Sequence, residues 1–93
     1  MKIREGFILR ETESKDNVKS AIVITVGQAS KVLRGYITMN ETACAVWHGI
    51  ETGKSVEEIA DTLCEKYFIS KEQALKDAEI LIEKLKSIGA VID

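Results

Sequence analysis

GYITMNETACAVW, residues 35–47, is the stretch in which the hydrophobic period of the chain changes. Before Asn40 the apolar residues are dense in β-branched side chains, which is typical of strands. After Asn40 they recur at spacings of three and four, which places them on one helix face. These residues are Ala43, Val46, Trp47 and Ile50. Asn40 itself suits a helix N-cap. The chain therefore divides into a strand half and a helical half.

The strand half is expected to hold three strands, at residues 3–10, 21–26 and 32–39. The second of them is apolar on nearly both faces, so we expect it at the centre of a sheet. Residues 11–17 and 27–30 form its connections, with turn-forming residues in each. Short connections favour an antiparallel meander.

The helical half is expected to hold three helices, which follow Asn40, Ser55 and Ser70. Ser55 and Ser70 each begin a capping box, in which side chains satisfy free backbone N–H groups. Gly53 and Gly89 are expected to end the first and third helices. The third helix is expected to bury Ala74, Ala78, Leu81, Leu85 and Ile88, with Leu75 and Ile82 on its flank.

Three strands followed by three helices predict one α+β domain over residues 1–93, with a three-stranded antiparallel sheet and helices on one face. The short, sharply capped helices are typical of a winged helix-turn-helix. The apolar tail at residues 90–92 suits a further short strand. No apolar run approaches the roughly 20 residues of a membrane span, and the start lacks a signal peptide. We therefore expect a cytoplasmic protein with reduced cysteines.

Composition favours a binding module over an enzyme. The 93 residues have a net charge of -2, and only 5% are aromatic, which leaves few anchors for a deep ligand pocket. One histidine and two cysteines leave little for nucleophilic or metal chemistry. The two halves of the chain differ in net charge: residues 1–40 carry +3 and residues 41–93 carry -5. We expect no catalytic residues and no cofactor.

A metal site, a ligand contact of Trp47 and a DNA-binding helix are each less favoured by the sequence than plain packing or a solvated surface. Cys44 and His48 share a helix face, but no CxxC or HxxxH pair exists, so we expect no metal site. Trp47 is expected in the core rather than at a ligand. A DNA-binding role needs a basic recognition helix, and the lysines of the third helix are balanced by acidic residues.

The block from Gly35 to Ala43, followed by Val46-Trp47, resembles the GxIxLNETA…IW signature of the PqqD-like family. The family is named after pyrroloquinoline quinone biosynthesis protein D. The stretch Gly53-Lys54-Ser55-Val56-Glu57-Glu58-Ile59 also fits its pattern, and the resemblance covers about residues 3–92. This chain has Met39 and Val46 where the signature has Leu and Ile.

The resemblance implies a winged-helix domain that recognises ribosomally made, modified peptides. Such a domain binds the leader of a precursor peptide as an added strand on the third strand, in a groove against the third helix. It then presents the peptide to a modifying enzyme, often a radical S-adenosylmethionine protein, and performs no chemistry itself.

The residues themselves fit this placement. An antiparallel meander leaves an outer strand with unpaired N–H and C=O groups, and residues 32–38 are the candidate edge. Lys31 and Arg34 add positive charge beside it. Ile80 departs from the apolar stripe of the third helix as a candidate exposed contact. The predicted peptide-binding residues are Val32, Leu33, Arg34, Gly35, Tyr36, Ile37, Thr38, Leu75, Ala78 and Ile82.

Other functions stay open from sequence. An edge strand also suits a structural subunit that pairs with a second copy of itself or docks on an enzyme, so a homodimer is possible. A winged-helix DNA regulator ranks below this. The expected partners are therefore a leader peptide and a modifying enzyme, without nucleic acid or membrane.

Overall fold

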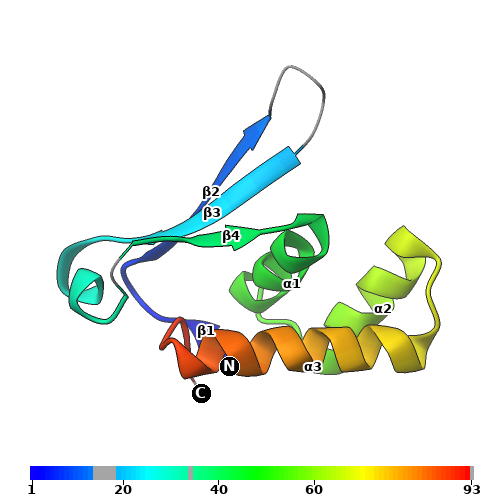
Figure 1. Cartoon of the computed structure of the whole chain (residues 1–93). Coiled ribbons are helices and arrows are strands. Elements are labelled where there is room, and N and C mark those ends of the chain that lie inside the picture. Colours follow the sequence, from blue (N-terminus) through cyan, green and yellow to red (C-terminus); the bar gives the residue numbers. More distant parts are fainter. Residues whose placement is uncertain (14–18, 34, 93) are drawn as a thin grey trace.

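The computed structural model describes residues 1–13, 19–33 and 35–92. The turn expected at residues 15–17, and Arg34, lie outside the described residues. Figure 1 shows a three-stranded antiparallel sheet followed by three helices, with the β2–β3 hairpin extending away from the helices. The predicted α+β arrangement is confirmed.

The main sheet has the strand order β2-β3-β4, so β4 lies at an edge. The bounds of β2, β3 and β4 are Phe7–Glu13, Lys19–Thr25 and Ile37–Met39. The strand rich in β-branched residues is central, as predicted. It pairs with β4 over three residues, with Val23 opposite Ile37 and Ala21 opposite Met39.

Two expected strands are wrong in extent, and a glycine interrupts each. Gly6 has a φ of 93°, which divides the strand expected at residues 3–10 into β1 (Lys2–Ile3) and β2. Gly35 has a φ of 98°, so the strand expected at residues 32–39 begins only at Ile37. A left-handed φ is incompatible with the pleated conformation of a strand. The short 3-10 helix η1 (Gly27–Lys31) lies ahead of this turn.

The apolar tail forms a strand, as the sequence suggested. β5 (Val91–Ile92) pairs antiparallel with β1, with Ile3 opposite Val91. The backbone N–H of Arg4 also donates to the carbonyl oxygen of Ala90 at 2.8 Å. This second, two-stranded sheet joins the two ends of the described chain beside the end of α3 (Figure 1).

The three helices begin at the predicted caps. The bounds of α1, α2 and α3 are Glu41–Glu51, Val56–Tyr67 and Lys71–Ser87. The Asn40 side chain accepts from the Ala43 N–H at 2.8 Å, and Ser55 forms both halves of its capping box. Ser70 forms only one half, since its hydroxyl accepts from the Gln73 N–H while the Gln73 side chain donates to Asp77 instead.

The core lies between the sheet and the helices. Trp47 is 1% exposed, which confirms its structural place. On α3 the expected stripe is rotated, because Ile82 is buried whereas Leu81 is only partly buried. The buried residues of α3 are Ala74, Ala78, Ile82 and Leu85. The Leu81 side chain is therefore partly accessible at the surface of α3.

Candidate functional site

The free edge of β4 has one residue whose backbone points outward. The Val26 N–H donates to the Gly6 oxygen at 2.8 Å, which continues the β2–β3 register. In an antiparallel ladder, backbone groups point alternately to the two sides, so the odd-numbered residues of β3 face β4. Their partners in β4 are Ile37 and Met39. The N–H and C=O of Thr38 therefore point away from β3, toward the open edge.

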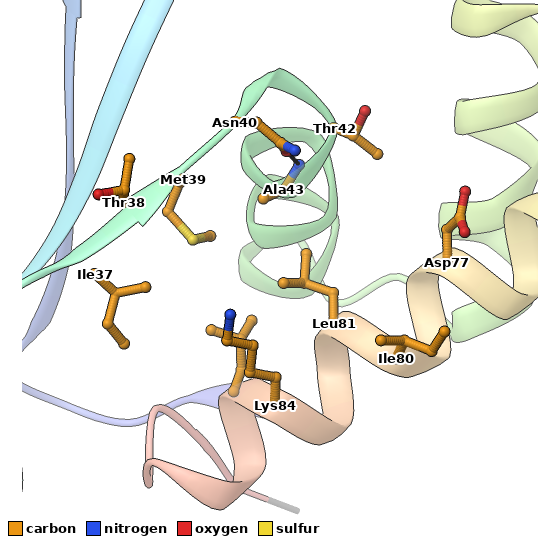
Figure 2. Close-up of a pocket in the computed structure, with 11 residues that line it drawn as sticks. Ile37, Thr38, Met39, Asn40, Thr42, Ala43, Asp77, Ile80, Leu81 and Lys84 are labelled. Carbon is orange, nitrogen blue, oxygen red and sulfur yellow. Dashed lines mark hydrogen bonds between the residues drawn. The ribbon is translucent and has the colours of Figure 1, made fainter.

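A groove lies between this edge and α3 (Figure 2). Its volume is about 400 Å³. β4, the start of α1 and one face of α3 form its walls. The lining residues are Ile37, Thr38, Met39, Asn40, Thr42, Ala43, Asp77, Ile80, Leu81, Lys84 and Leu85.

The floor of the groove is apolar and its rim is mixed. Met39 and Leu85 are 2% and 1% exposed, so they belong to the core and close the bottom. Ile80 is 60% exposed on the α3 side of the rim. An exposed isoleucine beside an apolar floor is available to bury against an incoming apolar side chain.

The groove is held in place by capping and by the sheet. Asn40 ends β4 and caps α1, so one side chain fixes the turn between two of the three walls. On the third wall, the Gln73 amide donates to Asp77 at 2.8 Å. In Figure 2 Asp77 lies toward Thr42, and Lys84 lies toward the strand end of the groove.

The strand residues predicted for binding are only partly brought to the groove. Ile37 and Thr38 line it. Val32 and Leu33 instead follow η1, and the Leu33 carbonyl accepts from the Thr25 hydroxyl at 2.9 Å. Tyr36, just ahead of β4, is 67% exposed and precedes the groove. Gly35 is exposed in the turn before it, and Arg34 is outside the described residues.

The helix residues predicted for binding lie on a different face of α3 from the one that lines the groove. Ala78 and Ile82 are buried in the core, at 0% and 4% exposure, so they cannot line an open surface. Leu75 is partly buried and is not among the lining residues. α3 instead presents Asp77, Ile80, Leu81 and Lys84. The sequence offered one signal for this face, namely the position of Ile80 outside the apolar stripe.

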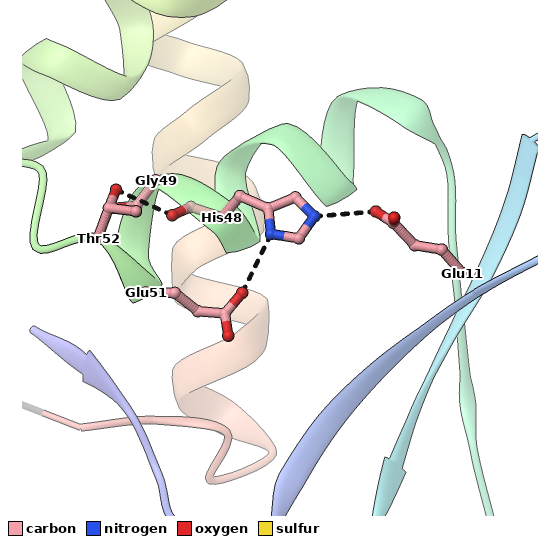
Figure 3. A network of polar contacts seen from close by, with 5 residues as sticks. All are labelled: Glu11, His48, Gly49, Glu51 and Thr52. Carbon is pink, nitrogen blue, oxygen red and sulfur yellow. Dashed lines mark hydrogen bonds and ion pairs between the residues drawn. The ribbon is translucent and has the colours of Figure 1, made fainter.

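A polar network lies on the other side of α1 (Figure 3). The His48 ring nitrogens lie 2.9 Å from a Glu11 carboxylate oxygen and 3.1 Å from one of Glu51. The hydrogen bond to Glu11 is the main reason that the pKa of His48 is raised above its usual value. The network ties α1 to β2 across the surface, because Glu11 lies on β2.

The residues considered for a metal do not converge in the described part of the chain. His48 contacts carboxylates, and no group of three or more His, Cys, Asp or Glu side chains suited to a metal occurs among the described residues. Burial raises the pKa of the Cys44 thiol above its usual value, with Glu11 and Glu41 adding to the effect. A raised pKa disfavours the thiolate that nucleophilic chemistry requires.

Residues 17–91 match the protein family described as coenzyme PQQ synthesis protein D (PqqD). The chain belongs to the PqqD family. The match includes β3, β4 and all three helices, and therefore every wall of the groove. The family resemblance carried by residues 35–47 is confirmed. No curated protein sequence matches the chain significantly.

Two solved structures have the same fold as this PqqD-family chain. One is TbiB1 in complex with the TbiA(beta) leader peptide, 21% identical, with a TM-score of 0.68 and full coverage of both chains. The other is lasso peptide synthetase B1 complexed with a leader peptide, 18% identical, with a TM-score of 0.72. That match covers 99% of this chain and 96% of the other.

Among the helices of the described residues, none combines the length and the apolar character that crossing a bilayer requires.

Proposed function

We propose that this protein binds the leader segment of a ribosomally made precursor peptide as an added strand on β4. The observation that carries the proposal is the outward-facing backbone of Thr38 beside an apolar groove. Main-chain hydrogen bonds to an open edge give affinity for an extended peptide, and pockets for alternate side chains give selectivity. Membership of the PqqD family supports the proposal, as does the likeness to two proteins solved with leader peptides.

The protein then acts as a non-catalytic accessory. The bound leader is presented to a modifying enzyme of the radical S-adenosylmethionine type, in the cytoplasm where the precursor is made. On the strand side we propose contacts from Tyr36, Ile37 and Thr38. On the helix side the groove favours Ile80 and Leu81 over the residues expected from sequence.

A direct test is fluorescence anisotropy with labelled leader segments of the precursor peptides encoded next to this gene. We expect at least one of them to bind with a Kd below about 100 μM, which corresponds to a binding free energy of about -5.5 kcal/mol. If none of the neighbouring peptides reaches that affinity, the proposal is contradicted.

Use of the β4 edge is tested separately by Thr38→Pro and Thr38→Val. Proline removes the outward N–H, which an edge strand tolerates without losing its own ladder bonds. Valine keeps the N–H and nearly the same shape. We expect Thr38→Pro to weaken peptide binding about tenfold or more, from the loss of a main-chain hydrogen bond and its geometry. Thr38→Val should bind like the wild type. Equal affinity of both variants would exclude the edge.

The same open edge also favours a second candidate, self-association through β4. A strand of a second copy would then occupy the groove. Light scattering after size exclusion distinguishes the two: we expect a monomer that forms a one-to-one complex with the leader peptide. A stable homodimer that excludes the peptide would favour the structural role.

A further inference from the structure

Along the groove, one face of α3 presents an acidic side chain, then two apolar side chains, then a basic side chain. Asp77 lies at the end near Thr42, and Lys84 at the opposite end near Ile37 (Figure 2). Ile80 and Leu81 lie between them. The groove is therefore polarised along its length.

The two charges are not equivalent. The Asp77 carboxylate accepts a hydrogen bond from the Gln73 amide at 2.8 Å. Lys84 has no hydrogen-bonding or ion-pairing partner for its side chain within the described residues. Its ammonium group in Figure 2 is directed into the space between α3 and β4. A free cation at the mouth of an apolar groove is complementary to a carboxylate on the occupant.

The spacing on α3 matches the repeat of an extended peptide. Lys84 and Ile80 are four residues apart, about 6 Å along the helix. Side chains at positions i and i+2 of an extended strand lie on one face, about 7 Å apart. One peptide can therefore place a carboxylate at Lys84 and an apolar side chain against Ile80 and Leu81. Its backbone remains free to pair with Thr38.

We infer that Lys84 determines specificity, by pairing with an Asp or Glu located two positions from a large apolar residue of the bound peptide. This inference rests on the proposed function and names the class of peptide: extended, with an acidic and an apolar side chain on one face. A peptide with a basic residue at that position is disfavoured, because it would bring two cations together at the rim of the groove.

The test begins with random peptides of about twelve residues, about 40 Å when extended, displayed and selected against the full chain. We expect enrichment of Asp or Glu two positions from Leu, Ile, Phe or Met. Selection against Lys84→Glu should instead enrich Lys or Arg at the acidic position. Lys84→Met keeps the apolar stem and should lose the charge preference.

One enriched peptide then serves for a charge-exchange cycle. Replacing its acidic residue by Lys should weaken binding to the wild type about tenfold, and Lys84→Glu should reverse that order, as expected for a direct charge pair. The matched control is Lys76→Glu, the same change on an exposed part of α3 outside the groove lining. It should change either affinity less than about twofold.

The outcomes separate this inference from the proposed function. Enriched peptides without an acidic preference, or a preference that persists in Lys84→Glu, would overturn the role of Lys84 and leave peptide binding intact. Failure to enrich any peptide on the wild-type chain would overturn both.

Discussion

Asn40 is the residue at which the chain leaves β4 and enters α1, and its side chain accepts the Ala43 N–H at 2.8 Å. Asn40→Ala removes this cap and should lower the free energy of unfolding by about 1 kcal/mol. Asn40→Asp keeps an accepting oxygen and should stay close to the wild type. Urea unfolding followed by circular dichroism measures both, and equal losses for the two variants would contradict the capping role.

His48 makes the stability of the folded protein depend on pH. Hydrogen bonding to Glu11 raises its pKa above the usual value of about 6.5, and Glu51 adds to the effect. The stabilisation from the charged ring is therefore complete below about pH 6.5. It is lost as the pH rises through the higher pKa of the folded state. Because the His48 side chain is 54% exposed, the stabilisation should stay below about 1 kcal/mol.

An NMR titration of the His48 ring measures this pKa directly. In Glu11→Gln the charge and the charge-assisted hydrogen bond are lost, so the pKa of His48 should move back toward 6.5. The difference in stability between wild type and His48→Gln should be larger at pH 5.5 than at pH 8.5. A pKa of His48 that is unaffected by Glu11→Gln would disprove the contact with β2.

At the scale of the element, the end of α2 carries a strained residue. Phe68 caps the helix with a φ of 55° and a side chain 93% exposed. A left-handed conformation is unfavourable for a residue with a Cβ, whereas glycine adopts it readily. Phe68→Gly should therefore raise the free energy of unfolding by about 0.5 kcal/mol. Phe68→Ala removes the ring but keeps the Cβ, so thermal unfolding should show no such gain for it.

The elements also show how far sequence patterns reach. The start of a helix depends on local capping, so the sequence alone predicted the three N-caps correctly. These are Asn40, Ser55 and Ser70. The strand bounds were not predicted correctly, because residues typical of strands lie on both sides of Gly6 and of Gly35 and the pattern does not show the break between them. Only the left-handed φ of those glycines, set by tertiary packing and turn geometry, ends the pleat.

Of the residues predicted from sequence to bind a peptide, the groove is lined by two from the strand side, Ile37 and Thr38, and by none from the helix side. On α3 the periodicity located an apolar stripe but not its angular centre, since Leu81 and Ile82 are adjacent and equally apolar. Packing against the other elements buries Ile82 and leaves Leu81 for the groove. When the buried stripe of α3 shifts by one residue around the helix, a different set of side chains lines the groove.

At the scale of the whole molecule, β1 and β5 join the two ends of the described chain. Val91 is 3% exposed, whereas its neighbour Ile92 is 38% exposed. Val91→Thr places a hydroxyl in the core and should cost about 1–3 kcal/mol. Ile92→Thr should cost about 0.5 kcal/mol or less, as for most surface changes. Calorimetry that found similar melting temperatures for both variants would mean that the β1–β5 sheet adds little to the global fold.

The charge halves of the sequence meet at the groove. β4 comes from residues 1–40, which carry +3, and α3 from residues 41–93, which carry -5. Lys84 is thus a cation within the acidic half, on the wall that faces the strand half. Net charge alone would have suggested an acidic wall, whereas the α3 wall of the groove carries one anion, Asp77, and one cation, Lys84.

The position of α3 beside the β4 edge also bears on aggregation. An open edge normally invites pairing with any neighbouring sheet, and proteins protect such edges. Here α3 stands beside the open edge, across a groove of about 400 Å³ (Figure 2). We expect this position of the helix to favour pairing of Thr38 with a single flexible segment over pairing with the edge of a whole sheet.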